Sequence, residues 1–146
     1  MRTEPSELIE RYLHSRGRRY FRGHHDGEYF FILTVGHERL HVHLEILPGS
    51  GDVLAVRVAP GHFFPAADRE RMISFARSWN AESRRAEVIV HESSDPNRIG
   101  VAAESFCPIA DGIDAEAFAD FADKTIRSAI KLFAELTPRA QLKNAG

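Results

Sequence analysis

Three segments of the chain repeat their apolar residues with the 3.6-residue period of an amphipathic helix. The first runs from Pro5 to Gly17, a residue suited to end a helix. The second covers residues 65–80 and the third covers residues 114–136, where Thr137-Pro138 predicts its end. Each pattern leaves the opposite side polar, so we expect all three helices to pack one face against a core.

Six shorter segments have the composition and alternation of β-strands. They cover residues 19–25, 28–35, 40–47, 53–58, 86–91 and 99–107. Asp26-Gly27 predicts a hairpin turn between the first two, residues 48–51 break the chain after the third, and Pro96 suits a type I turn between the last two. Every strand connection is short enough for antiparallel neighbours. The sequence predicts an α+β fold: a single antiparallel sheet packed with helices, in the order α-β-β-β-β-α-β-β-α.

The start of the third helix carries the sharpest local signal. Asp114 is a preferred N-cap residue, and Ile113 and Phe118 occupy the two positions of a hydrophobic staple. We therefore expect this helix to begin directly after Asp114.

Length and charge limit the class of protein. The chain has 146 residues, a formal charge of −2 and one cysteine. We expect one domain over residues 1–138 and a flexible tail over residues 139–146, in a cytoplasmic protein without an internal disulfide. The net negative charge gives no general attraction to nucleic acid or to an anionic membrane. No apolar segment is long enough to be a transmembrane helix.

Histidine chemistry is the first candidate function. His41 and His43 lie on the same side of one predicted strand because side chains alternate there with a period of two. No third ligand follows at a recognisable spacing, so exposed polar side chains are the favoured interpretation and we predict no metal and no cofactor. We set His24-His25 aside because adjacent strand residues face opposite sides.

Two further candidates are weaker. Cys107 stands late in a predicted strand, where a small buried side chain is more common than a reactive thiolate, and no nucleophile motif accompanies it. We predict no catalytic residue. Residues 16–22 interleave arginines with Tyr20 and Phe21, an arrangement that could stack on bases. In an acidic chain this segment is better interpreted as an exposed junction between helix and strand.

Several of these features together resemble the YbjN family, bacterial domains similar in fold to type III secretion chaperones. They are the strand-rich first half, Ser78-Trp79-Asn80 at the end of the second helix, the hairpin over residues 86–107, and Asp114-Ala115-Glu116. The resemblance covers residues 8–136. It implies a small α+β domain that holds a partner polypeptide, is commonly dimeric among the secretion chaperones, and carries no catalytic site. The histidine-rich sheet departs from an ordinary chaperone.

The strand over residues 28–35 points to the same kind of function, because it is apolar on both sides. We expect its second face to be covered either by a second subunit or bound peptide, or by a helix of the same chain; the sequence leaves both open. The residues assigned to this face are Phe30, Ile32, His41, His43, Ile89 and Phe106. The sequence thus predicts a non-enzymatic, chaperone-like or regulatory domain that binds a protein or forms a homodimer. The alternative is a small-ligand or metal-binding protein that uses the sheet histidines.

Overall fold

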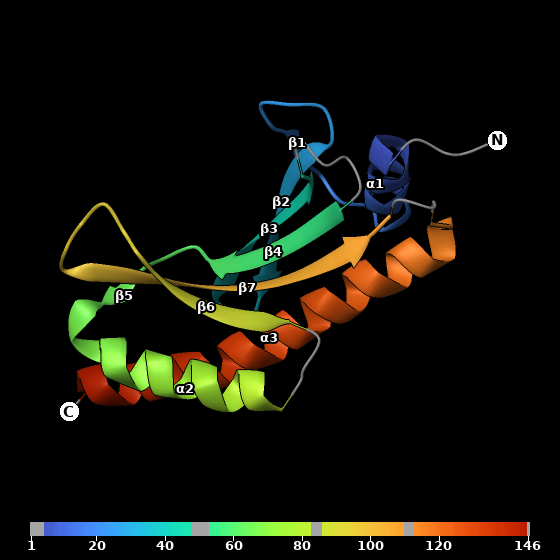
Figure 1. Cartoon of the computed structure of the whole chain (residues 1–146). Helices are drawn as coiled ribbons and strands as arrows, with labels where there is room; N and C mark the ends of the chain where they lie inside the picture. Colours follow the sequence, from blue (N-terminus) through green and yellow to red (C-terminus); the bar gives the residue numbers. More distant parts are fainter. Residues whose placement is uncertain (1–4, 48–52, 83–85, 110–112, 146) are drawn as a thin grey trace.

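One antiparallel sheet organises the computed structural model of the chain, which describes residues 5–47, 53–82, 86–109 and 113–145, with the backbone alone at 137–145. Its seven strands within these residues are β1 (Phe21–Arg22), β2 (Glu28–Val35), β3 (Glu38–Ile46), β4 (Val53–Pro60), β5 (Phe64–Pro65), β6 (Glu87–Glu92) and β7 (Arg98–Pro108). Strands β1, β2, β3, β4 and β7 are neighbours in that order. Strand β6 pairs along one edge of β7, while β4 and β5 share the other edge (Figure 1).

The helices are α1 (Pro5–Ser15), α2 (Arg69–Ala81), preceded by a 3₁₀ turn over Ala66–Asp68, and α3 (Ala115–Ala145). Their apolar stripes are buried together with one side of the sheet in a single core. Along β2, for example, Tyr29, Phe31 and Leu33 are buried, whereas Phe30 and Ile32 between them are exposed. In the described residues the helices therefore cover one face of a strongly twisted sheet (Figure 1). The α+β fold and the predicted element order are confirmed.

The predicted hairpins form, with one change of boundary. Strands β1 and β2 pair as expected and Gly27 has a positive φ of 88°, but β1 ends at Arg22 and a longer loop follows. The Glu28 carboxylate accepts the backbone N–H of His24 at 2.7 Å and holds this loop. In the second hairpin, Arg98 N–H donates to Asp95 C=O at 3.0 Å, which places Pro96 at the second position of the turn, as predicted. The predicted break at residues 48–51 lies outside the described residues.

The third helix begins where the sequence predicts and ends later. The backbone N–H of Ala117 donates to Asp114 Oδ1 at 2.7 Å, which confirms the N-cap. The predicted end at Thr137-Pro138 is wrong, because α3 continues to Ala145. A proline inside a helix removes one hydrogen bond and bends the chain, and this cost need not end the helix. That residues 139–146 are flexible stays a prediction.

Strand β5 was not predicted. Its two residues, Phe64 and Pro65, pair with Ile99 and Arg98 of β7 ahead of the 3₁₀ turn. The predicted second helix begins at Pro65, whereas α2 begins at Arg69. Two residues are too few to produce a periodic pattern, so such a strand leaves no signal in the sequence. None of the helices in the described part of the chain is both long enough and apolar enough to span a bilayer.

Candidate functional site

The side of the sheet opposite the helices, which we call the open face, is the candidate site. It carries the six residues that the sequence assigned to a second face: Phe30, Ile32, His41, His43, Ile89 and Phe106. The side chains of Phe30, Ile32 and Phe106 are 36%, 48% and 50% exposed. Their shared side follows from the strand registers, which set Phe30 opposite His43, Ile32 opposite His41 and Ile89 opposite Ala102. In the described part of the chain no helix crosses this face (Figure 1). A helix of the same chain, one of the two covers that the sequence left open, therefore does not cover it there.

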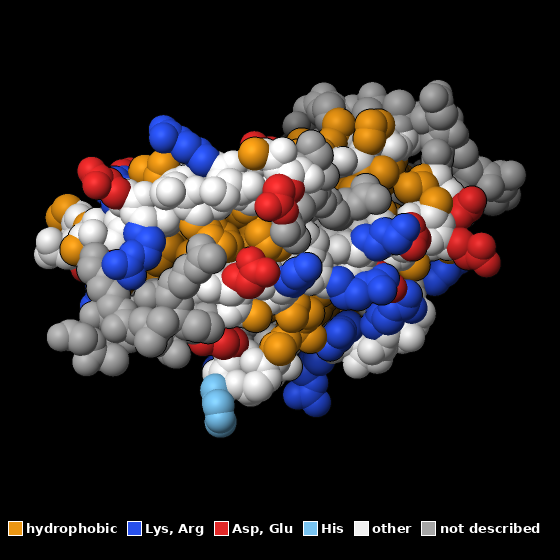
Figure 2. Space-filling view, turned by 90° about the horizontal axis from the view of Figure 1, so that it is seen from below, with side chains coloured by type: hydrophobic (Ala, Val, Ile, Leu, Met, Phe, Trp, Pro, Cys, Tyr) orange, Lys and Arg blue, Asp and Glu red, His pale blue; other side chains and the backbone are white. Residues whose placement is uncertain are grey.

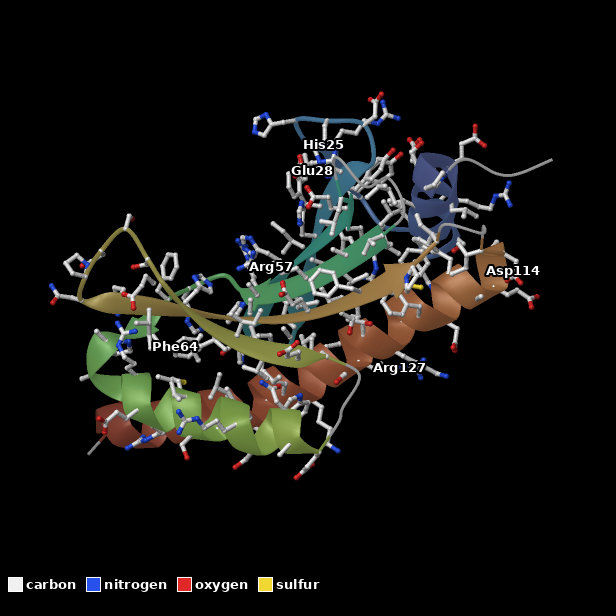
Figure 3. The ribbon with its side chains drawn as sticks, in the orientation of Figure 1. His25, Glu28, Arg57, Phe64, Asp114 and Arg127 are labelled. Atoms are coloured by element: carbon white, nitrogen blue, oxygen red, sulfur yellow. The ribbon has the colours of Figure 1, made fainter. Side chains whose placement is uncertain are left out.

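The large side chains of the open face stand mainly on the outer strands. The central strands β4 and β7 carry small residues between them, including Ala55, Ala59 and Ala102. Phe106 of β7 and Arg57 of β4 are the large exceptions. Arg57 lies nearer the middle. It is exposed and projects from the middle of the sheet, on the side away from α2 (Figure 3). The register places it between His43 of β3 and Glu104 of β7.

Phe21 also belongs to this face, and the sequence reasoning missed it. It lies directly opposite Phe30 in the β1–β2 pair and is 60% exposed. Residues directly opposite in an antiparallel pair project to the same side of the sheet. The hairpin register was the available signal, but the sequence reasoning considered Phe21 only as a base-stacking residue. Phe21 and Phe30 together form an exposed aromatic pair at one edge of the open face.

The two sheet histidines differ in their surroundings. His43 stacks on Phe30, with ring centroids 5.2 Å apart and an interplanar angle of 20°. Its Nε2 also lies 3.0 Å from Glu28 Oε2. His41 is exposed and lies close to Gly61. The two rings share one face as predicted, and of the two only His43 contacts the polar cluster described next, through Glu28.

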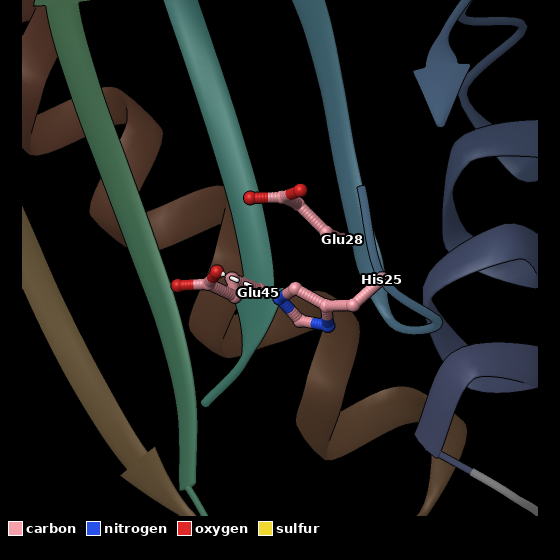
Figure 4. A group of neighbouring side chains, drawn as sticks. All are labelled: His25, Glu28 and Glu45. Atoms are coloured by element: carbon pink, nitrogen blue, oxygen red, sulfur yellow. Dashed lines mark hydrogen bonds and ion pairs between the residues drawn. The ribbon is translucent and has the colours of Figure 1, made fainter. Parts of the chain in front are cut away.

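That cluster lies at the end of the open face beside the β1–β2 loop and consists of His25, Glu28 and Glu45 (Figure 4). One ligand atom from each lies within 4.8 Å of the others, and all three side chains are half-buried. His25 Nε2 is 2.9 Å from Glu45 Oε2, and this contact, together with the backbone carbonyl of Asp26, raises the pKa of His25. The pKa of Glu28 is lowered, chiefly by the backbone N–H of His24 and also by His43.

The sequence missed this cluster because His25 was assigned to a strand. In a strand, His24 and His25 would face opposite sides of the sheet and could not act as a pair. In the structure His25 lies in the loop after β1, where the backbone is free to direct its ring across the sheet end to Glu45. Glu28 and Glu45 lie directly opposite in the β2–β3 register.

Cys107 and arginines from residues 16–22, the other candidate residues of the sequence, make structural contacts away from this cluster. Cys107 is half-buried against the core, with its Sγ 3.6 Å from the carbonyl of Pro108. Arg16 pairs with Asp123 at 2.6 Å and Arg22 pairs with Glu10 at 2.5 Å. Arg18 lies over the ring of Phe31, 5.3 Å from its centroid. These contacts favour the interpretation of residues 16–22 as a junction that ties α1 to the sheet and α3.

The helical side of the molecule has a different surface. Seen from the side of α2 and α3, acidic side chains are scattered among apolar ones, and several basic side chains gather right of the centre (Figure 2). Arg127 of α3 lies on this side of the sheet, opposite to Arg57 (Figure 3). The exposed aromatic pair and the His–Glu cluster both belong to the open face, which is therefore the candidate site for binding.

Comparisons with known proteins support the fold. No family model matches the sequence, and no curated protein matches it. Among solved structures, the chain is similar to YbjN from E. coli, described as "a putative transcription regulator", with a TM-score of 0.69, 12% identity and 91% of each chain covered. It is also similar to an uncharacterised protein from Methanothermobacter thermautotrophicus, with a TM-score of 0.58, 11% identity, and 93% of this chain and 99% of that chain covered. The resemblance noted in the sequence is thus confirmed at the level of three-dimensional structure, and the chain has the YbjN fold.

Proposed function

We propose that this protein is a non-enzymatic binding domain that uses its open face to hold a partner polypeptide or a second copy of itself. The observation that carries the proposal is the exposure of Phe21, Phe30, Ile32 and Phe106 on a sheet face without helices in the described part of the chain. Apolar side chains exposed together on one face are typical of surfaces that bind another protein.

The arrangement of side chains suits a sheet-face contact. Aromatic side chains on the outer strands offer large contact areas at a low cost in side-chain entropy. The small residues of β4 and β7 let an incoming side chain approach the backbone. Arg57 and Glu104, of opposite charge, lie side by side near the middle. In a two-fold dimer the same patch meets itself, so a patch that holds both signs of charge can match its own copy.

One of the two similar solved structures is described in words that are consistent with a binding role. E. coli YbjN is described as "a putative transcription regulator", and regulators act by binding other molecules. A regulatory or chaperone-like domain needs a surface for a partner and no catalytic group. The open face supplies such a surface.

The proposal is tested by changing the open face without changing the core. The double variant Ile32→Thr with Phe106→Thr removes two exposed apolar side chains and introduces β-branched residues suited to strands. The matched control is Val35→Thr, which alters an exposed residue of β2 on the other side of the sheet and is 38% exposed. Circular dichroism and thermal unfolding establish that wild type and both variants are folded.

Light scattering after size-exclusion chromatography then measures the molar mass over a range of concentrations, and pull-downs from the native cell compare captured proteins. We expect wild type and Val35→Thr to form a dimer or to capture the same partner, and the double variant to lose both. A wild-type protein that stays monomeric and captures the same proteins as the double variant would overturn the proposal.

A further inference from the structure

Two glutamates face each other at the end of the open face. Glu28 and Glu45 are directly opposite in the β2–β3 pair, and like charges in that position repel. Each carboxylate has a histidine ring within hydrogen-bonding distance: His43 at 3.0 Å from Glu28 and His25 at 2.9 Å from Glu45. The cluster therefore combines imidazole nitrogen and carboxylate oxygen, the donors that zinc accepts in proteins.

The ring of His25 is oriented by a contact outside the cluster. Its Nδ1 lies 2.8 Å from the backbone carbonyl of Asp26. A carbonyl oxygen only accepts, so Nδ1 carries a hydrogen, and Nε2 is the ring nitrogen that faces Glu45. Nε2 and Glu45 Oε2 lie 2.9 Å apart, and a proton bridges them when the ring is charged. In the neutral ring that keeps the hydrogen on Nδ1, Nε2 offers its lone pair to a metal ion at the same place. Histidines that bind metals commonly hold their second nitrogen on a backbone carbonyl in this way.

We propose that His25, Glu28 and Glu45 form a binding site for a divalent transition-metal ion, with Zn²⁺ the best-matched ion. The donor set contains a nitrogen, which favours zinc over Mg²⁺ and Ca²⁺, ions that prefer oxygen alone. The three ligand atoms lie within 4.8 Å of one another, so small side-chain rotations bring them around one ion. Water completes the coordination. His43 supports the site by holding the carboxylate of Glu28.

The site has a structural consequence. His25 belongs to the loop after β1, Glu28 begins β2 and Glu45 is near the end of β3. An ion held by all three residues joins this loop to the end of β3. The inference concerns residues outside the apolar part of the open face and does not depend on a protein partner, so either proposal can fail alone.

Isothermal titration of ZnCl₂ into the untagged, chelator-treated protein tests the site, with MgCl₂ as the comparison. We expect saturable binding of Zn²⁺ and none of Mg²⁺. His25→Gln and Glu45→Gln each remove a ligand and should weaken binding more than about 100-fold, and His43→Phe, which keeps the ring stack and removes the nitrogens, about 10-fold. The matched control is His41→Gln, on the same face outside the cluster, which should bind as the wild type does.

A second readout guards against loss of fold. Nitrogen-15 NMR of the histidine rings should show the Nε2 resonance of His25 moving as zinc is added, while His41 stays in place. The thermal unfolding temperature in zinc should rise for wild type and His41→Gln and stay unchanged for folded Glu45→Gln. Absence of saturable zinc binding, or zinc affinity equal in wild type, His25→Gln and Glu45→Gln, would overturn the assignment.

Discussion

The side chain of Asn80 pairs with both backbone groups of Val88. Asn80 Nδ2 donates to Val88 C=O at 3.0 Å, and Val88 N–H donates to Asn80 Oδ1 at 2.8 Å. Next to it, Trp79 Nε1 donates to Ala86 C=O at 2.9 Å. Strand β6 is the edge of the sheet beside β7, and its outward backbone groups would otherwise lack a strand partner. The end of α2 thus substitutes for a further strand.

Replacing Asn80 with alanine should lower the free energy of unfolding by about 1–3 kcal/mol, because two partly buried backbone groups lose their partners. Chemical denaturation measures this change, and hydrogen exchange should show reduced protection of the Val88 amide. The control is Asn97→Ala, in the exposed β6–β7 turn, which should change stability by less than about 0.5 kcal/mol. Equal stability of the two variants would contradict the role given to Asn80.

Sequence patterns predicted the long elements of this fold and missed strand β5 and the 3₁₀ turn that follows it. Strands β2 and β7 and helices α1 and α3 each contain enough apolar repeats to reveal their period. Strand β5 has two residues, and its pairing depends on distant β7. Trp79-Asn80 was noticed as a family-like pair, but its hydrogen bonds to the edge strand depend on the approach of α2 to β6, which only the folded chain shows.

The candidate site could likewise be predicted from the sequence only in part. Alternation along a strand sorts residues such as Phe30 and Ile32 onto one side, and so the open face could be grouped correctly from sequence. Which side the helices cover is a property of the whole fold. His25 could not be placed, because a loop residue has no period and its contact with Glu45 spans the strand end.

The N-cap of α3 offers a test of a local signal that sequence and structure share. Replacing Asp114 with alanine removes the acceptor of the Ala117 N–H and should cost about 1 kcal/mol. Urea denaturation measures the loss. Asp120→Ala is the control, since Asp120 lies within the same helix and makes an exposed ion pair with Lys124 at 3.0 Å. That variant should stay within about 0.5 kcal/mol of wild type.

Substitutions at two glycines with positive φ distinguish the cost of backbone strain from the cost of steric crowding. Gly17 has a φ of 64° and open space where a side chain would begin, whereas Gly27 has a φ of 88° and would place a Cβ 3.1 Å from Ile46. Gly17→Ala should therefore cost about 1 kcal/mol from the backbone alone. Gly27→Ala should cost clearly more, because the turn must also move away from β3. Thermal unfolding compares the two, and equal losses would show that the contact with Ile46 is relieved without cost.

Asp123 of α3 accepts hydrogen bonds from Tyr12 of α1 and from Arg16, which follows α1 directly. It accepts the hydroxyl of Tyr12 at Oδ1 and the guanidinium of Arg16 at Oδ2, both at 2.6 Å. Partial burial raises the pKa of Asp123, but the hydrogen bonds from Arg16 and Tyr12 outweigh this effect and leave the pKa below its usual value. The folded protein therefore favours the charged carboxylate.

A lowered pKa in the folded state fixes the sign of the pH dependence. The charged carboxylate of Asp123 contributes its full stabilisation above the pKa that an aspartate has in the unfolded chain, about 3.9. This stabilisation is lost as the pH falls through the lower pKa of Asp123 in the folded protein. Asp123→Asn should be less stable than wild type by about 1 kcal/mol at neutral pH, and the difference should shrink below about pH 4. Urea denaturation at a series of pH values measures it. Asp120→Asn, an exposed residue of the same helix, should follow the wild-type curve within a few tenths of a kcal/mol. A constant gap between Asp123→Asn and wild type down to low pH would mean that the carboxylate charge does not hold the two helices together.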